Sequence, residues 1–288
     1  MCIVGLTAFL LVYKWNDGKG RVSLKFQSTV RSFVNLSRSL SGHLPKASAE
    51  KECPYRLHDQ STEQFVKQVL VPPSKRPYRL KNSSRTDYSQ FGQMGRLMDR
   101  VLKGRRNGVF LEAGGFDGET YSNTLALEMH YNWTGVVVEG GPKLVRSIKS
   151  KRRKSYLVPT LLCNSMKVKY VAMSAQDSAG AAIRPGSFSK GDSSALPCVP
   201  LSAVFAALNL RKLDLISLDT EGSEPEILMT IPFNQVDADV FMVECGYCDQ
   251  PNGRDTKRKR DFLKTFFDAN GYDELHFDEV DFVYKKRR

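Results

Sequence analysis

The sequence lacks an apolar run long enough to span a bilayer at its N-terminus. Residues 2–13 carry no charge, but the stretch is only twelve residues long and ends before Lys14, whereas a spanning helix needs roughly 20 apolar residues. We expect residues 1–13 to be a signal-peptide core, the surviving half of a membrane anchor in a truncated chain, or a buried segment. An anchor or signal is favoured, because the basic, serine-rich sequence that follows offers this segment little core to join.

The larger C-terminal part of the chain lacks an excess of positive charge. Residues 1–110 hold 20 lysines and arginines against 7 acidic residues, whereas residues 111–288 hold 23 against 24. A generic nucleic-acid-binding domain needs a basic face on its folded part to neutralise phosphates. Nucleic acid is therefore a disfavoured partner, although short basic runs at 151–154, 257–260 and 285–288 keep a nucleic-acid methyltransferase as a remote alternative.

Zinc-binding patterns are absent from the six cysteines. Cys245 and Cys248 have CxxC spacing, but no second pair of cysteines or histidines accompanies them. We expect them to be small buried thiols at a strand end. In a lumenal setting, Cys163 and Cys198 are the first candidates for a disulfide.

The two indications of membrane topology disagree. The basic residues after the apolar segment favour a cytoplasmic stem under the positive-inside rule. Three N-x-S/T sequons, at Asn35, Asn82 and Asn132, favour the lumen. The expected localisation is membrane-associated in the secretory pathway, in the endoplasmic reticulum, Golgi or endosomes.

Three regions follow from composition and periodicity. Residues 1–13 are the apolar segment, residues 14–87 form a basic stem or linker with proline-rich patches and no sustained period, and residues 88–288 form the folded domain. Buried-type strands alternate with helices in that domain, which predicts a doubly wound, mostly parallel, Rossmann-like α/β sheet. A helix is expected from Tyr88 to about Gly104, and a final helix is expected to close on Gly271 as its left-handed cap, before the last two strands form a terminal β-hairpin. Residues 164–196 are expected to be a hairpin insertion that shapes the acceptor pocket together with the helix leading into the glycine loop of residues 110–119.

Acidic residues end several of the expected strands. Glu112, Glu139 and Glu244 each close a buried-type strand, and Asp219 closes another. Ligands of parallel α/β sheets bind at the carboxyl ends of the strands. The sequence therefore predicts that these carboxylates converge on one crevice.

The glycine loop after the first of these strands argues against a dinucleotide. It reads FLEAGGFDGE over residues 110–119, without the G-x-G-x-x-G spacing that brings backbone N–H groups to a pyrophosphate. Glu112 and Asp117 near a pyrophosphate would each cost about 4 kcal/mol per close like-charge pair. A P-loop is excluded because no Lys-Ser/Thr follows.

S-adenosylmethionine fits the same loop, because it carries no phosphate and is positively charged at sulfur and nitrogen. Gly114 and Gly118 permit close backbone approach, and Glu112 and Asp117 face positive charge. Glu139 lies 21 residues past Gly118, where a carboxylate reaches ribose hydroxyls. The alternative is that these residues are ordinary turn glycines and exposed loop acids.

Three ordered blocks then carry a resemblance to a known family. They are FLEAGGFDGETYSNTLALEMHYNWTGVVVEG, CVPLSAVFAALNLRKLDLISLDTEGSEPEIL and FMVECG. From about Phe91 to its C-terminus, the chain resembles the FkbM-type methyltransferase domain, and it looks like the animal branch that includes the insect membrane protein Star.

The resemblance implies a class I S-adenosylmethionine-dependent methyltransferase fold and methyl transfer to an oxygen of a small-molecule or glycan acceptor. It implies one set of cofactor-binding residues: Glu112, Ala113, Gly114, Gly115, Asp117, Gly118 and Glu139. The segment 219–222 would line the acceptor side. Residues 139–141 read EGG where relatives often have EPN, which leaves the adenine contacts open.

The catalytic base is expected to be Asp219 or Glu221, because a hydroxyl acceptor must lose its proton. The equally weighted alternative is that Asp219 caps the following helix, while Glu221 and Glu224 complement its dipole. The animal branch also implies a second function: a membrane-tethered, non-catalytic factor that assists trafficking of a membrane-protein client, a growth-factor precursor.

Overall fold

The computed structural model of the chain describes residues 57–174, 183–246, 254–275 and 281–288. Residues Arg56–Arg288 form one compact unit. The apolar N-terminal segment, Asn35 and Cys248 lie outside the described residues. Among the helices described, none has the length and apolar character needed to cross a membrane.

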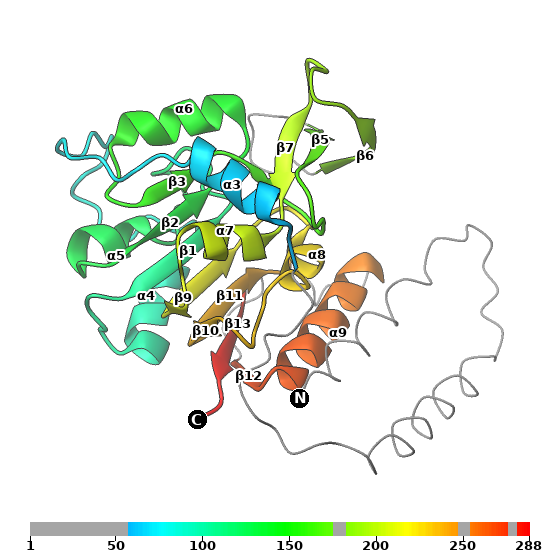
Figure 1. The fold of residues 1–288 in the computed structure, drawn as a ribbon. Coiled ribbons are helices and arrows are strands. Elements are labelled where there is room, and N and C mark those ends of the chain that lie inside the picture. Colours follow the sequence, from blue (N-terminus) through cyan, green and yellow to red (C-terminus); the bar gives the residue numbers. More distant parts are fainter. Residues whose placement is uncertain (1–56, 175–182, 247–253, 276–280) are drawn as a thin grey trace, which may run out of the picture. The chain divides into compact units, whose positions relative to one another are not determined.

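A seven-stranded sheet forms the centre of the domain, in the order β12-β13-β11-β9-β1-β2-β3. Five neighbouring strands, from β11 to β3, run parallel, and β13 is antiparallel to both of its neighbours. The expectation of a doubly wound, mostly parallel sheet is confirmed (Figure 1). The strands are β1 (Val109–Ala113), β2 (Thr134–Val138), β3 (Tyr156–Val158), β9 (Leu215–Leu218), β11 (Val240–Glu244), β12 (Tyr272–Leu275) and β13 (Asp281–Lys286).

One face of the sheet is covered by helices that come early in the domain. Their apolar side chains form a core with Phe110, Val137 and Met242 of the sheet. The predicted helix after residue 88 forms as an α-helix that continues into one π-helical turn, with Lys103 in a left-handed cap. These elements are α4 (Gln93–Leu97), η1 (Met98–Leu102), α5 (Leu125–His130) and α6 (Pro142–Lys151).

The opposite face is covered by α3 (Gln60–Val69), α7 (Leu201–Ala207), α8 (Glu224–Leu228) and α9 (Arg254–Ala269). Val66 of α3 is fully buried in the core of this face. Val71 pairs with Leu157 as an isolated bridge beside β3. The predicted boundary at residue 88 is therefore wrong: the described part of the stem, residues 57–87, packs onto the domain. It lacked a visible period because only Thr62 and Val66 of α3 are buried.

A second sheet stands beside the central one, in the order β4-β7-β5-β6. The antiparallel pair β5–β6 confirms the predicted hairpin insertion. A disulfide joins Cys163, just after β4, to Cys198 of β7, and so confirms the predicted pairing. These strands are β4 (Leu161–Leu162), β5 (Lys169–Met173), β6 (Ile183–Phe188) and β7 (Leu196–Val199); β8 (Lys212–Leu213) and β10 (Asp237–Ala238) form a separate two-stranded ladder.

Cys245 follows β11 directly and is almost fully buried. It is disulfide-bonded. The expectation of a free thiol is therefore wrong for Cys245. CxxC spacing alone did not separate a thiol from a disulfide.

The C-terminal part follows the prediction closely. Helix α9 ends before Gly271, whose φ of 85° is left-handed as expected for a glycine cap. Strands β12 and β13 then pair antiparallel as the predicted terminal hairpin. Their insertion at the edge of β11 places Glu244 opposite Asp281.

Candidate functional site

The glycine loop brings the ends of β1 and β9 into direct contact. Gly114 has φ 88°, and a β-carbon at this position would lie 1.7 Å from the backbone oxygen of Asp219. The N–H groups of Gly114 and Gly115 both donate to the carbonyl of Val138 at the end of β2. Only glycine fits here, because any side chain would collide with the neighbouring strand end.

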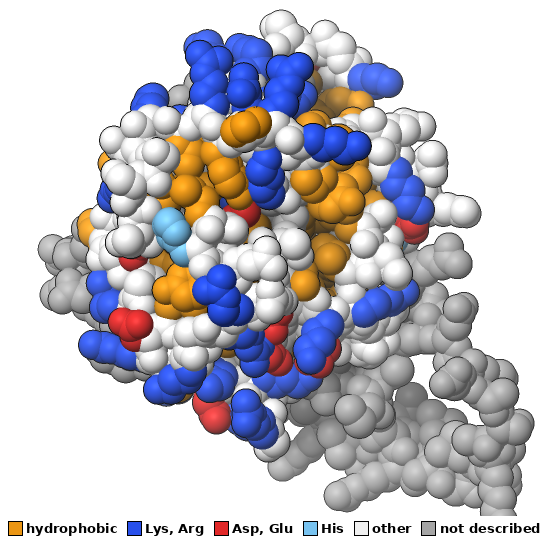
Figure 2. All heavy atoms as spheres, turned by 90° about the vertical axis from the view of Figure 1, so that its left-hand side faces the viewer, with side chains coloured by type: hydrophobic (Ala, Val, Ile, Leu, Met, Phe, Trp, Pro, Cys, Tyr) orange, Lys and Arg blue, Asp and Glu red, His pale blue; other side chains and the backbone are white. Residues whose placement is uncertain are grey.

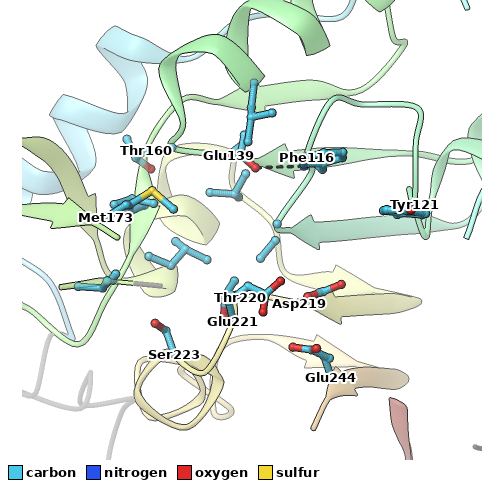
Figure 3. Close-up of a pocket in the computed structure, with 18 of the residues that line it drawn as sticks. Phe116, Tyr121, Glu139, Thr160, Met173, Asp219, Thr220, Glu221, Ser223 and Glu244 are labelled. Atoms are coloured by element: carbon cyan, nitrogen blue, oxygen red, sulfur yellow. Dashed lines mark hydrogen bonds between the residues drawn. The ribbon is translucent and has the colours of Figure 1, made fainter. Parts of the chain in front are cut away.

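A cavity of about 340 Å³ opens at the carboxyl ends of the strands (Figure 3). Its volume is within the range of small-molecule sites. The wall is formed by Gln90, Phe91, Ala113, Gly114, Phe116, Tyr121, Val138, Glu139, Gly140, Leu144, Thr160, Leu161, Leu162, Met173, Ile183, Asp219, Thr220, Glu221, Ser223, Glu244 and Gly246. Met173 and Ile183 confirm that the hairpin insertion shapes the pocket, and Phe91 confirms the same for the segment before the glycine loop.

Glu139 is fixed in one wall of this cavity by the loops on either side of it. One carboxylate oxygen accepts from the N–H of Phe116 at 3.0 Å, the contact drawn in Figure 3, and the other accepts from the N–H of Gly141 at 2.7 Å. A carboxylate has about four lone-pair positions and can accept several hydrogen bonds at once. The predicted position of Glu139 at the cavity is confirmed; its contact with a cofactor stays a prediction.

Gly140 allows close packing next to Glu139 because it has no side chain. A β-carbon on Gly140 would lie 2.5 Å from side-chain atoms of Leu161. The missing side chain therefore lets Leu161 pack directly beside Glu139, where it adds an apolar surface to the wall.

Asp219 and Glu244 form a carboxyl pair in another part of the wall (Figure 3). They follow directly on the paired residues Leu218 and Val243 of adjacent parallel strands. Burial, together with the charges of Glu244, Asp281 and Glu221, raises the pKa of Asp219 well above its usual range.

Burial, together with the charges of Glu224 and Glu221, also raises the pKa of Glu244, to about 7. Lys259 and a hydrogen-bonding interaction with Asp219 act in the opposite direction. Two interacting carboxyl groups with raised pKa values hold a proton into the neutral range.

Hydrogen bonds to Glu224 fix the loop that carries Glu221. The Glu224 carboxylate is fully buried and accepts from the N–H groups of Thr220, at 2.7 Å, and Gly222, at 3.1 Å. It also pairs with Lys259 at 2.7 Å. Glu221 lines the cavity with a left-handed φ of 56°. A non-glycine residue in this conformation is strained, and here the fixed loop imposes it.

The predicted alternative for Asp219, a helix cap, does not describe its position. The N-cap residue of α8 is Ser223, without a side-chain hydrogen bond, and the loop N–H groups donate to Glu224 instead. Asp219 is at the cavity wall.

Glu112 lies outside the cavity wall, which corrects its assignment to cofactor contact. Its side chain is buried and accepts from Ser122, the N–H of Asn123 and Thr124. It also forms an ion pair of 3.1 Å with Arg153, which is itself buried. The carboxylate anchors the chain that enters α5, because side chains of a strand alternate in direction and Ala113 takes the cavity side.

Asp117, Gly115 and Gly118 also lie outside the wall and form the loop's internal structure. Asp117 accepts from the N–H groups of Glu119 and Thr120 and from the Thr120 hydroxyl. A β-carbon on Gly115 would lie 2.2 Å from Val137, and one on Gly118 about 3 Å from Ile148 of α6. These residues determine the path of the loop without facing the pocket.

Aromatic residues at the cavity were missed by the sequence analysis. The rings of Phe116 and Tyr121 stack with centroids 6.1 Å apart. Phe91 and Tyr121 are 48% and 46% exposed, unusual for large hydrophobic side chains. Phe116 lies within the glycine loop and Tyr121 lies two residues after it, whereas Phe91 lies 19 residues before it.

The charge of the wall is of one sign. Glu139, Asp219, Glu221 and Glu244 line the cavity, and no Lys, Arg or His is among the described lining residues. No group of three potential metal ligands occurs in the described ranges. Lys and Arg side chains instead gather at the top of Figure 2, and Lys143, Arg146 and Lys149 of α6 are exposed.

The chain matches one known protein family and is similar to several solved structures. The family described as "Methyltransferase FkbM domain" matches residues 112–274. No curated protein matches the chain. Nothing in these comparisons supports a Star-like branch or a trafficking function.

Solved structures with a similar arrangement include three methyltransferases at low identity. An SAH-bound methyltransferase from Podospora anserina is 12% identical, with a TM-score of 0.39, over 94% of this chain and 100% of that one. An O-methyltransferase from Bacillus cereus in complex with SAH is 14% identical, with a TM-score of 0.38, over 90% and 97%. A putative O-methyltransferase from Klebsiella pneumoniae is 11% identical, with a TM-score of 0.41, over 90% and 97%.

Proposed function

The chain belongs to the FkbM methyltransferase domain family, and from this premise we propose that it methylates a hydroxyl oxygen of a small molecule or glycan. The fold is that of class I methyltransferases, and the family's cofactor is S-adenosylmethionine. The observation that carries the proposal is a cavity at the strand ends that contains Glu139 in one part of its wall and the Asp219–Glu244 pair in another.

The residues present fit a cationic sulfur nucleoside. Glu139 is positioned to accept ribose hydroxyls, and Leu161 and Leu162 beside it offer an apolar surface to a purine. The acidic wall suits a cation and disfavours a phosphate. When bound, S-adenosylmethionine supplies an electrophilic methyl group on a positively charged sulfur.

Asp219 and Glu244 would accept the proton of the acceptor hydroxyl. A base is most effective when its pKa lies near the working pH, and the pKa of Glu244 is about 7. Glu221, on the strained loop beside the pair, would orient the acceptor through a further hydrogen bond.

The acceptor is proposed to be neutral or cationic and to have an apolar face. Phe91 and Tyr121 offer exposed aromatic surface at the wall, on which the C–H face of a sugar or another flat group can pack. An anionic acceptor would meet up to four carboxyl groups without an opposing cation among the described lining residues.

Calorimetric titration of the full chain tests the cofactor part of the proposal. S-adenosylmethionine and its demethylated product are each expected to bind, and Glu139→Gln to weaken both by about tenfold, since a charged hydrogen bond contributes about 1.5–3 kcal/mol. Asp99→Asn is the matched control, because Asp99 is an exposed acid of η1 outside the cavity wall. Absence of heat with both ligands would refute the proposal.

Transfer to acceptors is then tested with labelled methyl groups. Neutral glycans and small polyols are expected to accept label, and their carboxylated or phosphorylated counterparts to accept much less. Label on a nitrogen or carbon atom instead of oxygen, located by mass spectrometry, would contradict O-methylation while leaving methyl transfer intact.

A further inference from the structure

The sequon at Asn82 lies in an exposed turn of the domain. Residues 81–86 are all exposed, and they include Ser84, the hydroxyl residue of the sequon. An N-linked glycan needs an asparagine amide and a hydroxyl two residues later on an accessible surface loop. The described fold offers both groups to solvent at this position.

The backbone beneath Asn82 is anchored, although its side chain is exposed. The N–H groups of Lys81 and Asn82 donate to the Glu119 carboxylate at 2.9 and 2.7 Å, and the Tyr88 hydroxyl donates to the Asn82 carbonyl at 2.8 Å. Burial acts to raise the pKa of Glu119, but Lys151 and these two N–H donors hold it below its usual range. A glycan on the outward-facing amide would therefore disturb none of these buried contacts.

The sequon at Asn132 is in a different environment. The Asn132 side chain donates to the side chain of Asn107 at 2.6 Å, and its backbone has a left-handed φ of 58°. The middle residue of the sequon, Trp133, is buried and donates to the carbonyl of Arg105. This sequon is accounted for by the fold, because its residues join the loop after α5 to β2. Among the described residues, none forms a hydrogen bond with the side-chain amide of Asn82.

Disulfides give an independent indication of the compartment. Cys163 and Cys198 are joined, and Cys245 is also disulfide-bonded. Disulfides persist in oxidising compartments, such as the endoplasmic reticulum lumen and the cell exterior, and are rare in the reducing cytosol. N-glycans are added in the same lumen, so the two observations agree on where this domain folds.

We propose that the domain faces the secretory lumen and carries an N-linked glycan on Asn82. In the reaction, the amide nitrogen of Asn82 forms a bond to the anomeric carbon of a lipid-diphosphate-linked oligosaccharide. The bond from that carbon to the diphosphate oxygen breaks, the lipid diphosphate leaves, and the amide nitrogen loses one proton. This inference is independent of methyl transfer, because none of the residues that it uses lines the cavity.

The test uses the full chain expressed in animal cells, with and without a glycosidase that removes N-glycans and converts the carrying asparagine to aspartate. Ser84→Ala removes the sequon without altering Asn82. Ser83→Ala is the matched control, because it changes the exposed neighbour and keeps the sequon. The peptide of residues 81–88 is read by mass spectrometry, and alkylation before and after reduction counts the disulfides.

The wild-type chain and Ser83→Ala are expected to show aspartate at position 82 after the glycosidase, and Ser84→Ala to show unmodified asparagine. Asparagine at position 82 in the wild-type chain would overturn the proposal, even if a chain given an additional signal sequence becomes modified. Cysteines 163 and 198 that alkylate fully without reductant would overturn the lumenal location. Binding of S-adenosylmethionine is expected to be the same for Ser83→Ala and Ser84→Ala.

Discussion

A β-carbon on Gly114 would lie 1.7 Å from the backbone oxygen of Asp219. The end of β1 can therefore approach the end of β9, and the candidate base is placed beside the glycine loop, only because position 114 has no side chain. From the sequence, Gly114 was predicted to allow a ligand to approach the backbone. The structure shows that it allows the ends of β1 and β9 to contact each other.

Gly114→Ala is expected to destabilise the domain by clearly more than the about 1–2 kcal/mol that the left-handed backbone conformation costs an alanine, and to abolish S-adenosylmethionine binding. Gly271→Ala is the matched control, because its φ of 85° is almost the same as the 88° of Gly114, but no atom lies within 4 Å of its added carbon. That control is expected to cost only about 1–2 kcal/mol from the backbone conformation. Equal effects in urea unfolding would show that the contact with Asp219 is unimportant.

Because Asp219 and Glu244 form a buried pair, we expect the free energy of unfolding to decrease between acidic and neutral pH. In the folded protein, the pKa of Glu244 is about 7 and that of Asp219 is raised, so the folded state binds more protons than the unfolded state. Stability contributed by these protonated groups is present below the unfolded pKa values near 4 and is lost as the pH rises toward about 7.

Glu244→Gln is expected to reduce this decline and to be more stable than the wild-type chain at pH 8. Chemical unfolding at several pH values measures the free energy of unfolding of both proteins, with Asp99→Asn as control. Methyl transfer, in contrast, is expected to increase as the pair loses its proton toward pH 7. An unchanged stability profile in Glu244→Gln would remove the argument for a shared proton.

Glu224→Ala is expected to lower the free energy of unfolding by about 3–5 kcal/mol, because it leaves Lys259 and two loop N–H groups without their buried acceptor. In the surviving folded fraction, acceptor turnover should decrease more than cofactor affinity, since the loop of Glu221 loses its support. Glu224→Gln is expected to recover part of both. A variant with wild-type turnover would show that Glu224 does not position the loop.

The variant Glu112→Gln tests whether Glu112 stabilises the fold or contacts the cofactor. Arg153 is buried and pairs with two carboxylates, Glu112 and Glu128, so the loss of one charge is expected to reduce stability by about 1–3 kcal/mol. Cofactor affinity at a temperature where the variant is folded should stay within about twofold of wild type, unlike that of Glu139→Gln. A tenfold loss of affinity with unchanged stability would return Glu112 to the site.

Serine at both Cys163 and Cys198 is expected to lower the free energy of unfolding by about 2–4 kcal/mol, because the disulfide constrains the unfolded chain. The single variants should lose a similar amount, since either one breaks the bond. Unfolding in the presence and absence of reductant measures this, and the double variant should respond less to reductant than the wild-type chain, because, among the described residues, only the disulfide of Cys245 remains. A wild-type chain with the same stability in both conditions would contradict it.

The amino-acid sequence determined most of the fold, because buried strands and amphipathic helices can be recognised from the period of hydrophobic residues along the chain. It gave the order of strands and helices, the left-handed Gly271, the hairpin insertion and the Cys163–Cys198 pair. It also placed Glu139 and Asp219 at strand ends, where a parallel sheet collects its ligands.

Only the tertiary structure decided which acids face the cavity. Glu112 and Asp219 both stand at strand ends, but Glu112 meets Arg153 and Asp219 meets Glu244. The packing of α3 was decided in the same way, through the fully buried Thr62 and Val66. Such outcomes depend on partners distant in the chain, and the direction and charge state of a side chain are set by those partners, which no local pattern of residues encodes.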